Sequence, residues 1–187
     1  MMPNNPNLIA FEVEGTTFHV EILDDCCEPP WEHSGWHGPV SEWTSRSKCP
    51  GEWILDEDGI VKRYDFAEAM RIAKRDGWDA PPYGVGTKGE RALRAVTADF
   101  EHLRRWCKGD WKYVCLHVML LGEDDEYGES GVLYDDYLGN VEYDYSSDGY
   151  WMGEAKAMAS EILQEVRRDK AVAKINRRFK DAMECGV

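Results

Sequence analysis

The chain has 187 residues, 43% of them hydrophobic and 12% aromatic, and a formal net charge of −14. A chain of this composition folds rather than staying disordered, and its length gives room for one well-buried core. The charge disfavours direct binding to nucleic acid or to an anionic membrane, because both depend on Lys and Arg.

The compartment follows from what the chain lacks. No apolar run reaches the roughly 18 residues of a membrane span, and residues 1–7 lack the basic and apolar regions of a signal peptide. We therefore expect a cytoplasmic protein whose six cysteines are reduced thiols.

The charge is sorted along the chain. Residues 1–60 carry a net −10 and residues 61–118 a net +4. Residues 119–154 contain 11 acids and no base, and residues 155–187 return to +3. The two acidic blocks are the first indication of a specialised surface.

The first predicted elements are strands. Residues 8–14 and 17–23 alternate apolar and polar side chains around Gly15-Thr16, which predicts a β-hairpin with one buried face. Residues 24–51 have no sustained period and contain four prolines, so we expect a long irregular loop. Two short strands follow, near 52–56 and 60–64.

Two helices are predicted next. Asp65 and Glu68 have capping-box spacing and open a helix that ends at Gly77. Thr87 and Glu90 form a second capping box before a longer helix. The apolar positions with helical spacing in that helix are Leu93, Val96, Phe100, Leu103 and Cys107.

Residues 111–121 form an apolar strand that we expect to be central, and residues 132–145 predict a second hairpin turning at Gly139-Asn140. A helical segment begins at Gly153. Its apolar stripe (Ala155, Met158, Ala159, Ile162, Val166) is followed by another (Val172, Ile175, Phe179, Ala182) that is rotated by about 120° at 3.6 residues per turn. Either the helix breaks near Asp169, or its tail serves a different partner.

These elements predict an α+β fold. We expect a single domain over 1–187, with an antiparallel sheet of hairpins packed against two central helices and a C-terminal helical segment. The loop 24–51 and a helical tail at 170–187 would be its irregular parts.

The loop around residues 30–39 is one candidate site. Cys26, His33, His37 and Cys49 supply enough nitrogen and sulfur for a tetrahedral zinc site, and zinc is the only cofactor that the sequence suggests. The alternative is that tryptophans pack this loop onto the core while the histidines satisfy backbone groups.

Other motifs carry less chemistry. Residues 84–89 place glycines and a lysine at a helix start, either as an anion site or as a capped helix N-terminus. Ser130 lacks the G-x-S-x-G elbow, and His102 and Cys107 are parts of a helix surface. We find no catalytic set and do not expect an enzyme.

The acidic hairpin is the strongest candidate. Every plausible register sets Asp135 or Asp136 opposite Asp144, and directly opposed like charges destabilise a strand pair. Such an arrangement suggests cation binding or display to a basic partner, although acids can also merely confer solubility. The predicted partner-binding residues are Asp124, Asp125, Glu126, Glu129, Tyr134, Asp135, Asp136, Tyr137, Glu142, Tyr143, Asp144, Tyr145 and Asp148.

Several stretches resemble a group of small acidic bacteriophage proteins of unknown function. They are Pro30-Trp-Glu, His37-Gly-Pro-Val-Ser41, Tyr64-Asp-Phe-Ala-Glu-Ala69, Arg75-Asp-Gly-Trp78, Ala80-Pro-Pro-Tyr-Gly-Val-Gly-Thr-Lys-Gly89, Ala98-Asp-Phe-Glu101 and Arg105-Trp-Cys107. The resemblance covers roughly residues 30–107. It implies a phage or prophage accessory gene acting in the cytoplasm of a host bacterium.

Three functions follow as hypotheses. The first is an anti-defence inhibitor that binds a basic, nucleic-acid-binding surface of a host protein, as a partial DNA mimic if the acidic N-terminal block lies beside the hairpin. The second is a zinc-stabilised module or metal-dependent enzyme at the His33 and His37 loop. The third is a self-assembling protein whose basic tail docks on an acidic block of a second copy, forming a homodimer.

Overall fold

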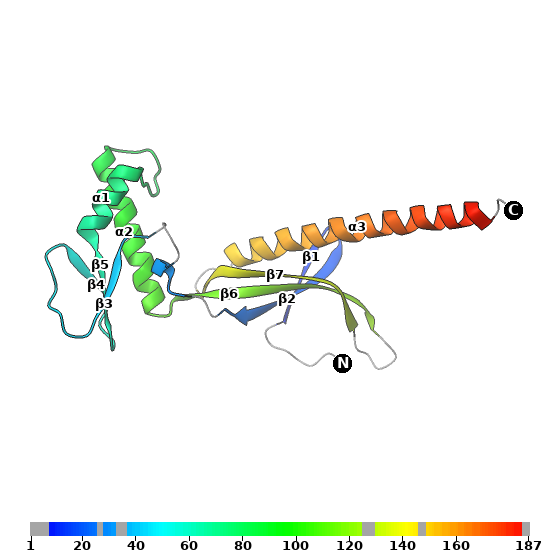
Figure 1. Ribbon diagram of the computed structural model, residues 1–187, viewed down its shortest axis with the longest axis horizontal. Coiled ribbons are helices and arrows are strands. Elements are labelled where there is room, and N and C mark those ends of the chain that lie inside the picture. Colours follow the sequence, from blue (N-terminus) through cyan, green and yellow to red (C-terminus); the bar gives the residue numbers. More distant parts are fainter. Residues whose placement is uncertain (1–7, 26–27, 33–36, 125–129, 146–148, 185–187) are drawn as a thin grey trace. The chain divides into compact units, whose positions relative to one another are not determined.

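The computed structural model describes residues 8–25, 28–32, 37–124, 130–145 and 149–184. Within these ranges the chain forms helices and two antiparallel sheets, which confirms the α+β class (Figure 1). The sheets have the orders β1-β2-β6-β7 and β3-β5-β4. The elements are β1 Leu8–Val13, β2 Thr16–Asp24, the 3-10 helix η1 Pro30–Glu32, β3 Val40–Trp43, β4 Glu52–Asp56, β5 Val61–Asp65, α1 Phe66–Asp76, α2 Lys88–Cys107, β6 Trp111–Asp124, β7 Ser130–Asp144 and α3 Tyr150–Glu184.

The chain divides into two compact units, whereas the sequence predicted one domain. Unit 1 comprises residues 1–26 and 113–187, and unit 2 comprises residues 27–112. Each unit has its own hydrophobic core. Unit 2 is inserted between β2 and β6, which are neighbours in the sheet of unit 1. The two segments of unit 1 are therefore separated by 86 residues in the sequence.

The predicted N-terminal hairpin of unit 1 is confirmed. Val13 pairs with Thr16, and Glu14 and Gly15 form the turn with φ values of 50° and 75°. Two residues with positive φ match the right-handed twist of the strands that they join. The turn lies one residue earlier than the alternation indicated.

The predicted hairpin at 132–145 is wrong, because this segment is a single strand. β7 runs through Gly139-Asn140 and pairs with β6, which lies between β2 and β7 and is central as expected. Leu138 and Val141 both pack on the core, and Asn140 has φ 57°. An extra residue that shifts the alternation in this way is typical of a β-bulge. Asp135 and Asp136 therefore do not lie across a hairpin from Asp144.

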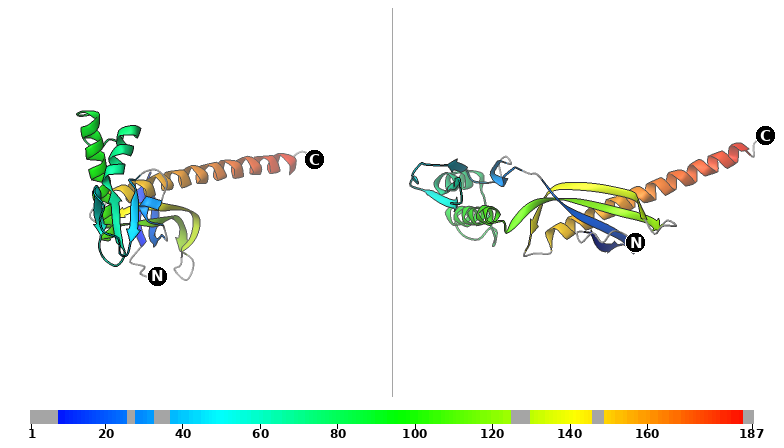
Figure 2. Two further views of the ribbon diagram at one scale, coloured as in Figure 1. Left: turned by 60° about the vertical axis from the view of Figure 1, so that its left-hand side comes forward. Right: turned by 90° about the horizontal axis from the view of Figure 1, so that it is seen from below.

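Helix α3 covers one face of this sheet (Figure 2). It is continuous over 35 residues, so of the two alternatives for the region near Asp169 the break is excluded. The first predicted stripe is buried in the core. Its members are Ala155, Met158, Ala159, Ile162 and Val166. Within the described residues, no helix has both the length and the hydropathy of a membrane span.

Unit 2 packs α1 and α2 against the sheet β3-β5-β4. Both predicted helix starts are confirmed: the Asp65 carboxylate accepts from the Glu68 N–H at 2.9 Å, and Thr87 and Glu90 form a reciprocal capping box. Gly77 ends α1 with φ 76°. Contrary to the predicted stripe, Leu93 is 49% exposed. The expected loop 24–51 contains strand β3 and the helix η1, because β3 pairs with β5.

A partly buried ion cluster lies at β4. The Glu52 carboxylate accepts hydrogen bonds from Arg46 Nη2 at 2.5 Å and from the Cys49 N–H at 2.7 Å. Arg63 Nη1 lies 3.8 Å from the same carboxylate. The hydrogen bond from Arg46, followed by that from Cys49, lowers the pKa of Glu52 below its ordinary value. The acid is thus an internal part of unit 2.

Candidate functional site

The sheet of unit 1 has a second face, which points away from α3 and is called the open face below. Phe18, Val20 and Leu116 point into the core beside α3. Because neighbouring side chains in a strand point to opposite faces, Glu21 and His117 lie on the open face, where they are paired across β2 and β6.

His117 is the centre of the open face. Its Nε2 lies 2.9 Å from the Asp135 carboxylate on β7, and its Nδ1 lies 3.9 Å from that of Glu21 on β2. The Tyr137 ring stacks on the imidazole at 4.0 Å with an angle of 8° between the planes. Three adjacent strands thus contribute to one aromatic and acidic cluster, in which the His117 side chain is only 13% exposed.

The rest of the open face combines exposed apolar groups with acids. Leu133 and Tyr137 on β7 are 62% and 57% exposed, and Asp135 lies between them on the same face. Glu12 on β1 and Glu142 on β7 are exposed and have core-facing neighbours on both sides in sequence, so they also lie on this face.

The charge of these segments has one sign. Residues 1–26 and 113–155 contain 16 acids and no Lys or Arg. Lys112, at the start of β6, and Lys156, in α3, are the nearest bases along the chain. The structure places strands from both acidic blocks of the sequence in one sheet, so their negative potentials add.

Two of the other predicted tyrosines lie on the face that α3 covers. Tyr134 and Tyr143 pack against the core on the α3 side, and Tyr145 is 62% exposed. The Tyr134 hydroxyl donates to the Asp169 carboxylate of α3 at 2.9 Å, and this bond raises the pKa of Tyr134. Asp136 shares the α3 side with Tyr134. Of the predicted tyrosines, Tyr137 is the one that lies in the cluster at His117.

Part of the predicted set lies outside the described residues. The undescribed residues of the set are Asp125, Glu126, Glu129 and Asp148. The side chain of Asp124 is not described either. The open-face cluster is therefore built from Asp135 and Tyr137, which the sequence identified, together with Glu21 and His117, which it did not.

The missed residues had a local signal. Alternation along 111–121 places Val114, Leu116 and Val118 on one face of the strand and His117 on the other. The sequence therefore predicts that His117 points away from the core. Its pairing with Glu21 and Asp135 was not predictable, because the order of the strands depends on contacts between distant segments.

The predicted zinc loop is held by Asp99 of α2. The Asp99 carboxylate lies 2.6 Å from His37 Nδ1 and accepts from the Gly38 N–H at 2.8 Å and from the Tyr64 hydroxyl at 2.6 Å. Cys49 contacts Arg46 instead. Cys26 and His33 lie outside the described residues, and the described part holds no group of three His, Cys, Asp or Glu side chains placed for a metal.

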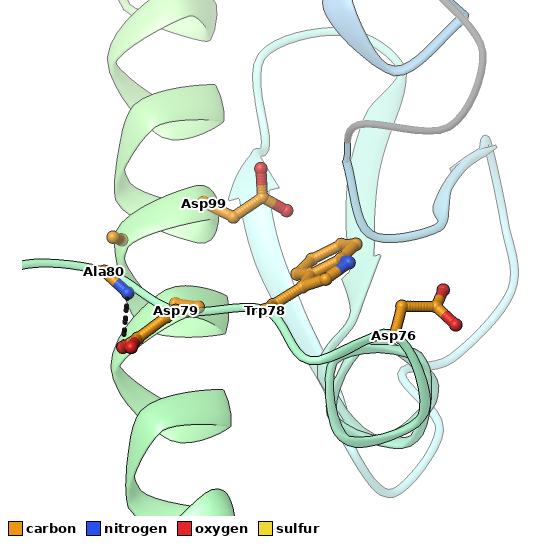
Figure 3. Close-up of a pocket in the computed structure, with 7 residues that line it drawn as sticks. Asp76, Trp78, Asp79, Ala80 and Asp99 are labelled. Carbon is orange, nitrogen blue, oxygen red and sulfur yellow. Dashed lines mark hydrogen bonds between the residues drawn. The ribbon is translucent and has the colours of Figure 1, made fainter. Parts of the chain in front are cut away.

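A pocket of about 510 Å³ lies beside this cluster, between the end of α1 and helix α2. Asp76, Asp79, Asp99 and Trp78 line it (Figure 3). Its acids have partners: Asp76 binds Arg75, and Asp79 binds Arg94 and the Ala80 N–H. Figure 3 shows their carboxylates pointing in different directions. The pocket therefore lacks the convergent geometry of a cation site.

The remaining motifs of unit 2 make contacts within the unit. Residues 84–89 lead into a capped helix, because Glu90 accepts from both the N–H and the hydroxyl of Thr87. His102 stacks on Trp111 at 4.3 Å. Burial raises the pKa of the Cys107 thiol to about 11, so the thiol stays protonated and is a poor nucleophile. Among the described cysteines, Cys49 and Cys107 of unit 2 and Cys115 of unit 1 are free thiols.

No family model, curated protein or solved structure matches the chain. The resemblance to phage proteins stays a prediction.

Proposed function

We propose that the protein is a phage-type inhibitor that binds a basic, nucleic-acid-binding surface of a host defence protein through its open face. The observation that carries the proposal is the cluster of Glu21, His117, Asp135 and Tyr137 on a sheet whose strands contain a single Lys or Arg, Lys112 at the start of β6. The class of partner rests on the resemblance to phage proteins.

The cluster has the composition of an interface centre. Tyr137 is exposed but fixed by its stack on His117, so little side-chain entropy is lost when a partner covers it. Rigid aromatic side chains commonly contribute most of the binding free energy at protein interfaces. Leu133 provides a second exposed apolar contact on the same strand.

The acids supply attraction and orientation. A one-signed surface speeds the encounter with a basic partner and makes binding sensitive to salt. Acids on one face of a strand repeat at best every ~6.6 Å, twice the rise per residue. Duplex DNA presents one charge per ~1.7 Å of its axis. Because the acids are more widely spaced than the phosphates, the sheet could imitate the charge of a phosphate backbone only in part.

An affinity pulldown from bacterial lysate tests the proposal. We expect the immobilised full chain to retain a protein at low salt and to release it in about 1 M NaCl, where screening is strong. The retained protein should have a basic surface, and its purified form should lose nucleic-acid binding when the chain is added.

Two matched variants locate the surface. Asp135→Asn with Tyr137→Ser should abolish retention, because both side chains belong to the cluster. Asp58→Asn with Tyr83→Ser makes the same chemical change at exposed positions of unit 2 and should leave retention intact. Equal retention by both variants, or full retention in about 1 M NaCl, contradicts the proposal.

A second candidate function is a zinc-stabilised loop or metal-dependent site in unit 2. A histidine that binds a metal commonly donates its other ring N–H to a carboxylate, and His37 Nδ1 makes such a contact with Asp99. His37 would then use Nε2. Stoichiometric zinc in the purified protein, with a lower Tm in chelator, supports this candidate. Absence of zinc with unchanged melting contradicts it.

A further inference from the structure

The second half of α3 presents an exposed apolar stripe. Residues 167–184 are called the α3 tail below. Burial of the helix in the unit 1 core ends at Val166, and residues 167–178 are all exposed. Val172 and Ile175 are 49% and 52% exposed. In Figure 1 the tail continues beyond the strands that the first half of α3 covers.

The tail is basic, and its bases have a defined position relative to the stripe. It holds seven Lys or Arg and three acids. Arg168, Val172 and Ile175 follow one another at spacings of four and three residues, so they share one side of the helix, with Arg178 at its edge. At about 1.5 Å per residue, this basic-apolar-basic row is roughly 15 Å long.

The open face offers the complement of this row. On β7, Leu133 and Tyr137 are exposed on either side of Asp135, over roughly 13 Å at ~3.3 Å per residue. Glu21 lies beside them, near His117. Along β7 the exposed Tyr137 thus has an open-face acid on either side, Asp135 before it and Glu142 after it, as the apolar pair of the tail has a base on either side.

The tail of a chain cannot reach the open face of the same chain. The first half of α3 packs on the opposite face of the sheet, and the helix is unbroken to Glu184. The start of the tail is also fixed in place, since Arg167 forms an ion pair with Glu14 and Asp169 accepts from Tyr134. An occupant of the open face that comes from this sequence must belong to another copy.

Pairing of two tails with each other is disfavoured. Seven bases against three acids on each tail give a net charge of like sign on both, so the helices repel in either direction. The acidic sheet, by contrast, is opposite to the tail in charge.

We propose that the α3 tail of one copy docks on the open face of a second copy, and that the second tail docks reciprocally on the first. Val172 and Ile175 then cover Tyr137, while Arg168 and Arg178 reach the open-face acids on either side of it along β7, Asp135 and Glu142. The contact is isologous, as in most homodimers. This inference goes beyond the proposed function, because it requires no host protein.

The dimer conceals the surface that the proposed function uses. Self-association and partner binding therefore compete, and a host protein must displace the tail. Retention in a pulldown should rise as the protein is diluted toward its monomer, because binding a monomer requires no dissociation of the dimer.

Sedimentation velocity of the full chain over a range of concentrations tests the dimer. We expect a dimer at low salt that dissociates in about 1 M NaCl, where the Debye length is only about 3 Å. Val172→Asp with Ile175→Asp should give a monomer of unchanged circular dichroism, since both side chains are exposed. A monomer at every concentration at low salt overturns the proposal.

A matched pair of variants locates the face of the tail. Arg168→Glu with Arg178→Glu should weaken dimerisation at least tenfold. Lys170→Glu with Arg177→Glu changes the charge equally on the opposite side of the same helix and should weaken it much less. Equal effects of the two variants contradict a defined docking face.

A charge exchange distinguishes tail-on-sheet docking from every other dimer. The Arg168→Glu, Arg178→Glu copy and an Asp135→Lys, Glu142→Lys copy should each be monomeric alone and should form a heterodimer when mixed. Dimerisation of the second variant by itself indicates tail-to-tail pairing and overturns the proposal. The first variant keeps its open face, so its retention in the pulldown tests the proposed function separately.

Discussion

The acids of the two units have different partners. In unit 2, Asp56 binds Lys62 at 2.9 Å and Asp79 binds Arg94 at 3.2 Å, so carboxylates and cations meet inside the unit. In unit 1, the strands of the sheet contain a single Lys or Arg, Lys112 at the start of β6, and Asp135 meets His117 instead. The ion pairs of unit 2 stabilise its fold, whereas the acids of the unit 1 sheet create a negative electrostatic potential that can attract a basic partner.

Of the variants that test this contrast, Asp99→Ala is expected to reduce stability the most. Asp99→Ala removes the acceptor of three hydrogen bonds and leaves the hydroxyl of the fully buried Tyr64 without it. We expect unit 2 to lose about 3 kcal/mol of unfolding free energy, measured by urea denaturation. Tyr64→Phe, which removes one donor, should cost about 1 kcal/mol. A loss below about 1 kcal/mol for Asp99→Ala contradicts its role as a hub.

The next largest loss of stability is expected from a steric clash at Gly38, in the same loop. A Cβ added at Gly38 would lie 2.5 Å from the Tyr64 ring carbon Cζ, so Gly38→Ala must displace the loop or the ring. We expect a loss of about 2 kcal/mol from overpacking. Gly89→Ala in α2 meets nothing within 4 Å and should instead stabilise the helix by up to about 1 kcal/mol. Similar melting of the two variants would contradict the close approach.

A smaller effect depends on pH. The hydrogen bonds from Arg46 and the Cys49 N–H lower the pKa of Glu52, so its ionised form stabilises unit 2. This stabilisation is present above the ordinary Glu pKa of about 4.3 and is lost as the pH falls through the lowered pKa. Urea midpoints measured down from neutral pH should fall less steeply for Glu52→Gln, which is less stable at neutral pH. An unchanged slope would show that Glu52 is not coupled to folding.

The smallest effect on stability is expected on the open face. Asp135→Asn with Tyr137→Ser should change the unfolding free energy of unit 1 by no more than about 0.5 kcal/mol, because both side chains are exposed. The same variant should lose the partner in the pulldown. A stability loss of several kcal/mol would assign the cluster to the fold rather than to binding.

Much of the fold was readable from local signals. The turn before Thr16, the capping residues Asp65 and Thr87 and the end of α1 at Gly77 act through contacts within a few residues. The buried stripe of α3 was readable because its helical period persists from Ala155 to Val166. The second stripe was also visible, and its members Val172 and Ile175 are exposed.

The candidate site was only partly readable. Asp135 and Tyr137 were identified, but on a wrong premise, since the repulsion expected across a hairpin does not occur. A shift in alternation at Gly139-Asn140 is produced equally by a turn and by a bulge, and local sequence does not separate them. The bulge forms instead of the turn because β7 pairs with β6.

The sequence by itself determined the α+β class, the helices α1, α2 and α3, the N-terminal hairpin and the acidic character of the sheet segments, because these depend on composition and local periodicity. Only the tertiary structure decided that unit 2 is inserted between two neighbouring strands, and that Glu21, His117, Asp135 and Tyr137 meet on one face. The physical reason is the same in both cases. Strand order and register are set by hydrogen bonds and packing between segments that are distant along the chain.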